Sequence, residues 1–263
     1  MPPPPPPPSA VVIIPARMGS TRFPGKVLAS ETGKPLIQHV WESAARAKSA
    51  SRTVIATDDD RVRDAAAKFG AECVMTRADH PNGTSRLAEA AATLSLPPDT
   101  IVVNAQGDEP ELDAGLIDAA VEALVKSGAS VSTVATPFHA SERPDNPNIV
   151  KVVLRKDGSA LYFSRSLIPF PRDTGSARVA PLKHVGLYVY RRSFLDQYNA
   201  LPVTDLEQTE QLEQLRILYH GFQIAVAVRD TSGAGGIDTP EQYAAFVARW
   251  RARGSSATSK PAS

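Results

Sequence analysis

Polar side chains suited to binding phosphate lie in one short segment near the start of the sequence. The segment follows an apolar run at 11–14 and contains the side chains Arg17, Ser20, Arg22 and Lys26. Backbone N–H groups and fixed cations in such a loop bind phosphate oxygens. Five residues separate Gly19 from Gly25, which excludes a Walker A loop, and no dinucleotide-binding glycine fingerprint is present. The segment predicts a local polyanion site, and the alternative is an ordinary basic surface loop.

Two acidic residues far apart in the sequence have the chemistry of magnesium ligands. Asp108 follows a β-branched run at 101–103 and the flexible Gly107, and Asp238 directly precedes a Thr-Pro helix start. Carboxylates bind Mg²⁺ together with phosphate oxygens, so the pair predicts a metal that activates a triphosphate. The alternatives are a turn acid at Asp108 and a helix N-cap at Asp238. The acids at 58–60 are predicted to cap a helix rather than to bind metal.

A further polar segment follows the third predicted strand and ends near Thr84, where a helix is expected to begin. It contains Arg77, His80 and Gly83. These residues offer donors, a cation and a flexible turn, which are suited to closing over a base or a ribose. The alternative is a capped loop without a ligand, and His80 is predicted to brace the loop rather than to transfer protons.

A fourth group of side chains is suited to an acidic, polyhydroxylated substrate. In the segment 183–190, His184, Tyr188 and two further polar-face positions alternate with valine and leucine, so one face of a strand is polar and aromatic. Arg165 has the geometry to pair with a carboxylate. Glu213 and Gln214 add groups that bind hydroxyls. The alternative for the strand at 183–190 is a packing role alone.

The elements that must position these residues alternate along the chain. Short apolar runs predict buried strands at 11–14, 53–56, 72–75, 100–103, 130–134, 150–154, 185–190 and 224–228. Helical periodicity lies between them, at 35–48, 60–69, 84–94, 114–126, 206–220 and 240–251. This order predicts an α/β fold with a doubly wound, mostly parallel (mixed) sheet. Ligands bind such sheets beyond the carboxyl ends of the strands, where the polar segments lie.

The composition is that of a globular protein with one principal domain. The chain has 263 residues, a net charge of +1 and one cysteine, Cys73, so neither a disulfide framework nor a nucleic-acid-binding charge is expected. No apolar run approaches the ~20 residues of a membrane helix. We expect disordered tails at 1–9, which is polyproline, and at 254–263. Between them, residues 10–253 form a single domain with a smaller inserted lobe at about 141–205.

Several of these segments together resemble one family. They are Ile14-Pro15-Ala16-Arg17 through Gly25-Lys26, Arg77-Ala78-Asp79-His80, Gln106-Gly107-Asp108-Glu109-Pro110, Tyr162-Phe163-Ser164-Arg165, His184-x-Gly186-x-Tyr188, Leu212-Glu213-Gln214-Leu215-Arg216 and Asp238-Thr239-Pro240. The chain is similar from about 11 to 251 to the 3-deoxy-manno-octulosonate (Kdo) cytidylyltransferases, or CMP-Kdo synthetases. Ser85 and Gln242 depart from the family pattern, which has acids at both positions.

The resemblance implies an activity and a set of roles. It implies a nucleotidyltransferase-type fold, Mg²⁺ dependence, a cytoplasmic homodimer, and formation of CMP-Kdo and pyrophosphate from CTP and Kdo for lipopolysaccharide synthesis. It implies catalytic roles for Lys26, Arg22 and Asp108, and metal binding by Asp108 and Asp238. It implies nucleotide binding by Arg17, Ser20, Arg22, Lys26, Arg77, Gly83 and Thr84, and sugar-acid binding by Gln106, Arg165, His184, Tyr188, Glu213 and Gln214.

Two other functions remain open at this stage. A cytidylyltransferase for a related sugar acid, such as 8-amino-Kdo or a sialate, would share the phosphate loop and differ in the sugar pocket. A non-catalytic nucleotide-binding scaffold would bind CTP without releasing pyrophosphate. Neither a basic stripe nor an amphipathic pattern indicates binding to nucleic acid or to a membrane.

Overall fold

A single mixed sheet forms the centre of the protein. The computed structural model describes residues 9–20, 22–173, 179–231 and 235–257. These form a nine-stranded sheet with the main order β3-β2-β1-β4-β8-β5-β9. The strands are β1 (Ala10–Ala16), β2 (Ala50–Thr57), β3 (Glu72–Met75), β4 (Ile101–Asn104), β5 (Val131–Pro137), β6 (Lys151–Leu154), β7 (Ala160–Ser164), β8 (Leu182–Arg191) and β9 (Ile224–Val228).

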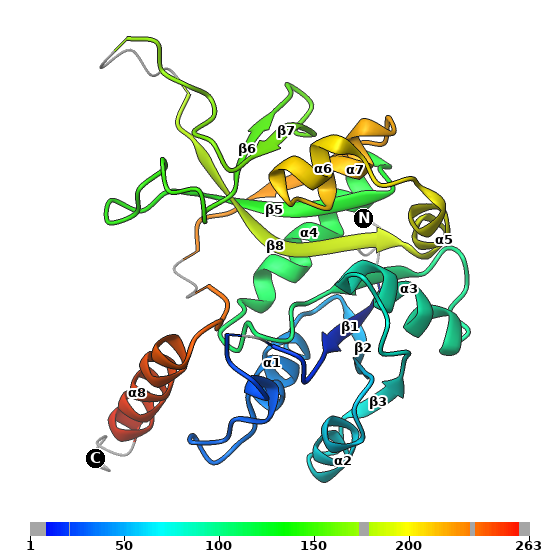
Figure 1. The fold of residues 1–263 in the computed structure, drawn as a ribbon, viewed down its shortest axis with the longest axis vertical. Coiled ribbons are helices and arrows are strands. Elements are labelled where there is room, and N and C mark those ends of the chain that lie inside the picture. The colour runs from blue at the N-terminus through cyan, green and yellow to red at the C-terminus, as the bar shows by residue number, and fades with distance from the viewer. Residues whose placement is uncertain (1–8, 21, 174–178, 232–234, 258–263) are drawn as a thin grey trace, which may run out of the picture.

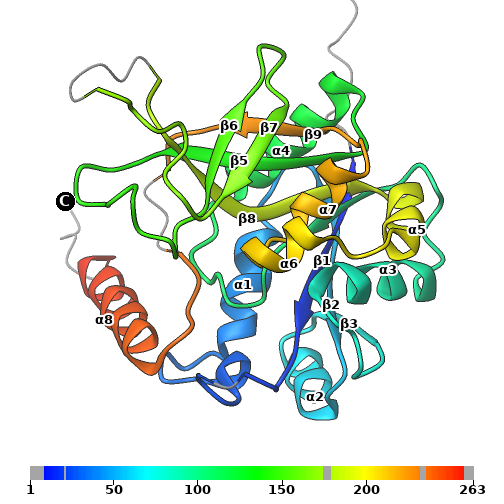
Figure 2. The ribbon, with the colours of Figure 1, turned by 45° about the horizontal axis from the view of Figure 1, so that its top comes forward.

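The strand directions confirm the predicted α/β class and show where the sheet is mixed. β1 lies between β2 and β4 and is parallel to both, and β5 is parallel to β9. β8 is antiparallel to both β4 and β5. It follows the hairpin of β6 and β7 and also pairs with β6 (Figure 2). This hairpin lies within the segment at about 141–205 that the sequence predicts as a smaller lobe.

Helices cover both faces of the sheet. The helical elements are η1 (Lys26–Leu28), α1 (Leu36–Ala44), α2 (Asp60–Lys68), α3 (Gly83–Thr93), α4 (Ala114–Ser127), α5 (Arg192–Ala200), α6 (Asp205–Glu210), α7 (Gln214–Tyr219) and α8 (Pro240–Ala257). One core joins α1, α2 and α4 to the sheet, and a second core joins α3, α5 and α7 to it. Apolar side chains therefore leave both faces of the central strands, as the continuous apolar runs in the sequence predict. No helix in the described ranges is long and apolar enough to cross a membrane.

The parallel pairing of β1 and β4 brings two polar segments to one edge of the sheet. Ile13 is in register with Asn104, so the chain leaves both strands on the same side. The turn after β4 then packs directly on β1, because a Cβ atom at Gly107 would lie 2.5 Å from the carbonyl oxygen of Pro15. Only glycine permits this approach, and it places Asp108 beside the phosphate loop.

The last helix packs against α1 rather than against the sheet. Figure 1 shows α8 at the edge of the molecule, and Figure 2 shows the same arrangement from another side. Leu36 of α1 packs in one buried cluster with Tyr243 and Phe246 of α8. The Glu111 carboxylate, three residues after Asp108 in the sequence, accepts hydrogen bonds from Arg249. These contacts hold α8 in place, and Asp238 lies just before its first residue, Pro240.

The structure corrects several predicted boundaries. The helix expected at 206–220 is wrong, because Gln211 adopts a left-handed backbone with φ of 52° and divides it into α6 and α7. Neither β7 nor α5 was expected. Helix α8 continues to Ala257, so part of the tail predicted from 254 is helical. Of the tails predicted at 1–9 and 254–263, residues 1–8 and 258–263 lie outside the described residues.

Candidate active site

Lys26 lies at the centre of the residues that the sequence analysis selected. Its Nζ donates a hydrogen bond of 2.7 Å to Oδ2 of Asp108 and one of 3.2 Å to Oδ1 of Asp238. It also donates to the carbonyl oxygen of Ile237, again at 2.7 Å. The lysine side chain is only 10% exposed. The structure therefore brings the phosphate loop and both acids to one point, although the acids lie 82 and 212 residues along the chain from Lys26.

The carboxylate of Asp238 is available to this site because another residue caps α8. Oε1 of Gln242 accepts hydrogen bonds from the backbone N–H groups of Asp238 at 2.7 Å and Thr239 at 3.0 Å. Oγ1 of Thr239 accepts one from the N–H of Gln242 at 3.3 Å. This reciprocal pattern is a capping box with Thr239 as N-cap. The N-cap alternative for Asp238 is therefore wrong, and its side chain instead contacts Arg22 at 3.0 Å.

We expect Thr239→Ala to weaken the start of α8 by about 1 kcal/mol, because the hydroxyl that caps the helix is lost. Asp238 would then be held less firmly beside Lys26. The thermal unfolding midpoint should fall by a few degrees and the apparent affinity for Mg²⁺ should decrease. Thr239→Ser keeps the hydroxyl and should behave as the wild type. Equal midpoints for the alanine and serine variants would contradict the capping role.

A cavity of about 500 Å³ surrounds this centre. Its lining includes the phosphate-loop residues predicted to bind the triphosphate and both acids, namely Arg17, Ser20, Arg22, Lys26, Asp108 and Asp238. The loop after β3 and the start of α3 form the facing wall, through His80, Pro81, Asn82, Gly83 and Arg86. Guanidinium and ammonium groups thus face a hollow at the carboxyl ends of β1 and β4. Such an arrangement is suited to a polyphosphate.

The two acids at this cavity fit a hard divalent cation. The Asp108 side chain is 30% exposed and the Asp238 side chain is 40% exposed, so both carboxylates are accessible from the cavity. The described residues contain no group of three or more His, Cys, Asp or Glu side chains that could hold a metal ion. A site with two carboxylates suits Mg²⁺, which keeps several waters and takes its other ligands from substrate phosphates.

A second cavity, of about 230 Å³, adjoins the first. Gly83, Gln106 and Glu213 line both. Three more of the residues predicted to bind the sugar line the second cavity, namely His184, Tyr188 and Gln214, and so does Thr84. Arg165 does not line it. The polar face of β8 therefore opens toward the phosphate-binding cavity, as the alternation in the sequence predicts.

Burial favours the neutral forms of His184 and Glu213 in the second cavity. It lowers the pKa of His184 to about 3, so the ring is neutral and forms a 2.9 Å hydrogen bond with Oγ1 of Thr133. Burial also raises the pKa of Glu213, whose Oε2 accepts a 3.0 Å hydrogen bond from Oγ1 of Thr84. Within the described residues, Oη of Tyr188 and Oδ1 of Asn104 are buried without a hydrogen-bond partner. Buried polar atoms of this kind are rare, and here they favour a hydroxylated ligand.

Two predicted site residues lie outside both cavities. The Arg165 guanidinium donates to the backbone carbonyl oxygens of Glu210 at 2.6 Å and Pro147 at 3.1 Å, so it joins the lobe to α6. Arg77 has an exposed side chain that contacts Glu89 at 3.3 Å. Conversely, Arg86 was not selected from the sequence, although it is 4% exposed and lines the larger cavity. No sequence signal marks it, because an arginine in a helix is ordinarily expected at the surface.

Comparisons with known proteins agree with this geometry. The family model described as cytidylyltransferase matches residues 11–224. The 3-deoxy-manno-octulosonate cytidylyltransferase of Neisseria gonorrhoeae (strain NCCP11945) is 48% identical over 235 residues, which are 87% of this chain and 92% of that protein. The chain belongs to the 3-deoxy-manno-octulosonate cytidylyltransferase family. The family relative from Syntrophobacter fumaroxidans is 50% identical, with 89% of this chain and 94% of the relative covered.

Solved structures extend the comparison to the fold of the family. A CMP:2-keto-3-deoxy-manno-octonic acid synthetase complexed with CTP superposes with a TM-score of 0.86 at 39% identity, covering 93% of this chain and 99% of that one. A cytidylyltransferase from Leptospira borgpetersenii has a TM-score of 0.59 at 18% identity over 91% of this chain and 85% of its own, and shows a likeness of fold alone. The family resemblance and fold class predicted from the sequence are confirmed.

Proposed function

We propose that this protein activates Kdo by transferring CMP from CTP to its anomeric hydroxyl, with release of pyrophosphate, for lipopolysaccharide synthesis. The observation that carries the proposal is the meeting of Lys26 with Asp108 and Asp238 beside a second, polar and aromatic cavity. The names of the relatives and the CTP complex of a similar structure support the same reaction.

The larger cavity would hold the nucleotide. Arg17, Ser20, Arg22 and Lys26 would bind the triphosphate, while Gly83 and Thr84 would lie beside the rest of the nucleotide. The attacking sugar acid and the α-phosphate are both anionic, so their repulsion must be reduced before an in-line attack. Lys26 and Arg22 supply fixed positive charge where charge develops on the leaving pyrophosphate.

Asp108 and Asp238 would hold a Mg²⁺ ion, which fits their exposure to the cavity and their hard oxygen ligands. Bound there, the ion would supply neutralisation of phosphate charge and activation of the leaving group. Lys26 lies between the two carboxylates and screens their mutual repulsion. The ammonium of Lys26 and a bound cation would therefore share the same carboxylate charge.

The smaller cavity would hold the sugar. No Lys or Arg lines it among the described residues, and the His184 ring is neutral because burial lowers its pKa to about 3. The carboxylate of the sugar acid would therefore lie toward the cation-rich cavity, where Gln106 is shared between the two. Tyr188 and Gln214, which line the smaller cavity alone, and Glu213, at the junction of the two cavities, would bind the hydroxyl groups.

Pyrophosphate release tests the function directly. With Kdo and Mg²⁺ present, we expect release with CTP and little or none with ATP, GTP or UTP. Parallel assays with 8-amino-Kdo and a sialate separate the related sugar-acid activities, because only the preferred acid should give rapid turnover. Binding of CTP without pyrophosphate release from any of these acids would instead favour the nucleotide-binding scaffold.

We also propose that the protein acts in the cytoplasm, where CTP is made, as a homodimer joined through the inserted lobe. Leu161 and Phe170 of the lobe are 53% and 76% exposed, and a second copy would cover these apolar side chains. Sedimentation velocity should show a dimer for the wild type and a monomer for Phe170→Asp. Tyr219→Asp, which changes another exposed aromatic residue at 63% exposure, is the control. A monomeric wild type would contradict the proposal.

A further inference from the structure

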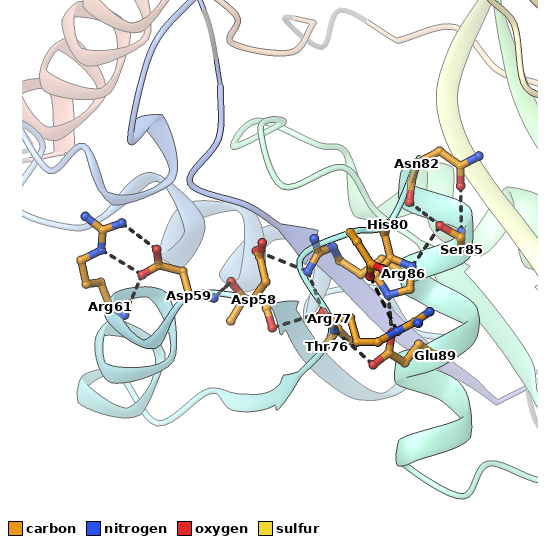
Figure 3. A network of polar contacts seen from close by, with 12 residues as sticks. Asp58, Asp59, Arg61, Thr76, Arg77, His80, Asn82, Ser85, Arg86 and Glu89 are labelled. Atoms are coloured by element: carbon orange, nitrogen blue, oxygen red, sulfur yellow. Dashed lines mark hydrogen bonds and ion pairs between the residues drawn. The ribbon is translucent and has the colours of Figure 1, made fainter.

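The loop between β3 and α3 forms one wall of the proposed nucleotide cavity. His80, Pro81 and Asn82 belong to that wall. The loop contains no strand or helix, so its shape depends on contacts made by its side chains. Figure 3 shows these contacts. Arg77 and His80 of the loop contact side chains of α3.

Glu89 of α3 gathers the contacts that hold the loop. Its Oε1 accepts a 3.1 Å hydrogen bond from the backbone N–H of Arg77, and its Oε2 contacts Nε of Arg77 at 3.3 Å. The same Oε2 pairs with Nε2 of His80. The His80 side chain is only 4% exposed, whereas that of Arg77 is 70% exposed, so His80 forms the sheltered half of this network.

The second ring nitrogen of His80 is also occupied. Nδ1 of His80 lies 3.1 Å from Oγ of Ser85, and the same oxygen lies 3.0 Å from the carbonyl oxygen of Asn82. Ser85 belongs to the first turn of α3, so this contact joins the ring to the helix a second time.

The contact with Glu89 identifies Nε2 of His80 as a donor. Burial raises the pKa of Glu89, but hydrogen bonds from Arg77 and His80 outweigh it and lower the pKa overall. Glu89 is therefore a carboxylate, which only accepts hydrogen bonds, so Nε2 donates to it. With Nδ1 bonded to Ser85, both nitrogens of the ring are held by α3.

We infer that His80 is a positioning residue for the nucleotide, holding the loop at 76–82 against α3 through the contacts of its ring with Glu89 and Ser85. This inference deepens the proposed function, because the loop forms a wall of the site where CTP would bind. Both ring nitrogens are engaged with the protein, so the ring has no free nitrogen for proton transfer to a substrate. The prediction that His80 braces the loop is supported by the same contacts.

The other contacts of the loop are separate from those of His80. Arg77 and Asp79 contact each other at 3.8 Å on the exposed side of the loop. Arg86 of α3 is paired with Asp58 at 3.3 Å and donates to Oγ1 of Thr76 at 2.6 Å, which holds the start of the loop. Loss of the His80 contacts should therefore release the part of the loop that lines the cavity and raise the KM for CTP, while kcat changes little.

Substitutions at His80 and Glu89 separate the proposed role from a general loss of structure. His80→Phe keeps an aromatic ring but removes both donors, and we expect the KM for CTP at neutral pH to rise about ten-fold with kcat within about two-fold. Glu89→Ala removes the carboxylate that the ring contacts, and the KM for CTP should rise by a similar factor. Glu89→Gln keeps an oxygen that accepts from Nε2, so its KM should lie closer to that of the wild type. His220→Phe, which changes a partly exposed histidine bonded to Pro202, is the control and should match the wild type.

Different results would contradict the inference and the proposed function. An unchanged KM in His80→Phe or in Glu89→Ala would overturn the inference while leaving the reaction intact. If His80→Phe does not fold, the comparison of Glu89→Ala with Glu89→Gln decides alone. If the wild type fails to release pyrophosphate from CTP and Kdo, the proposed function fails. Calorimetric titration of CTP into the wild type, Glu89→Ala and Glu89→Gln then tests the inference through binding alone.

Discussion

Replacing Asp108 by asparagine is expected to lower kcat for pyrophosphate release by about 10²–10³. The amide keeps the size of the side chain but removes the negative charge that faces Lys26 at 2.7 Å and that would bind Mg²⁺. Because the carboxylate is 30% exposed, folding should be little affected. Circular dichroism and the thermal midpoint should therefore match the wild type while turnover is lost.

A metal titration distinguishes a lost ligand from a general loss of activity. For Asp108→Asn, the Mg²⁺ concentration at half-maximal rate should increase, and Mn²⁺ binding measured by electron paramagnetic resonance should weaken. Asp99→Asn is the matched control, because Asp99 is exposed and precedes the same strand, β4, at its opposite end. Near-wild-type rates for Asp108→Asn at saturating Mg²⁺ would exclude Asp108 as a metal ligand.

The location of this site could be predicted because it depends on strand order and not on side-chain detail. Apolar runs identified β1 and β4, and in a doubly wound sheet the loops that leave parallel strands meet at one edge. That rule alone placed Lys26 near Asp108. Asp238 could be located only in part, since its segment precedes a helix outside the sheet and its position depends on the packing of Phe246 and Tyr243 against α1.

The features that were missed depend on local backbone geometry or on tertiary contacts. Leucines at helical spacing predicted one helix at 206–220, but periodicity cannot reveal that Gln211 adopts a positive φ. The break is stabilised from outside the local sequence pattern, because Glu207 of α6 and Arg216 of α7 form a buried ion pair at 2.5 Å. It also places Glu213 at the junction of the two cavities.

Two residues show why chemistry alone did not assign every role. Arg165 has the right group to bind a carboxylate, yet backbone carbonyl oxygens occupy its guanidinium. Gln242 is one of the two positions at which the sequence departs from the pattern that it resembles. In the structure its amide oxygen completes the capping box of α8, so the Asp238 carboxylate is not used as a cap and contacts Lys26 and Arg22 instead. In both cases the partner that decides the role could not be identified from residue type and spacing.

Replacing Lys26 by methionine should reduce kcat/KM for CTP by about 10²–10³. This variant loses a positive charge, whereas Asp108→Asn loses a negative one. Methionine preserves much of the apolar stem but removes the ammonium that would contact the triphosphate. Turnover should therefore fall although both acids remain. Lys48→Met, at an exposed position in the link between α1 and β2, is the matched control and should retain full activity.

The sign of the change in metal affinity separates the two variants. In the structure the Lys26 ammonium lies between Asp108 and Asp238, so a divalent cation must compete with it for the same carboxylate charge. Without the ammonium, the two carboxylates repel each other and attract a cation more strongly. Mn²⁺ should thus bind the CTP-free Lys26→Met variant more tightly than the wild type, whereas it should bind Asp108→Asn more weakly. Weaker binding in both variants would mean that Lys26 organises the acids for the metal instead of competing with it, and equal binding in all three proteins would mean that these acids do not hold the metal.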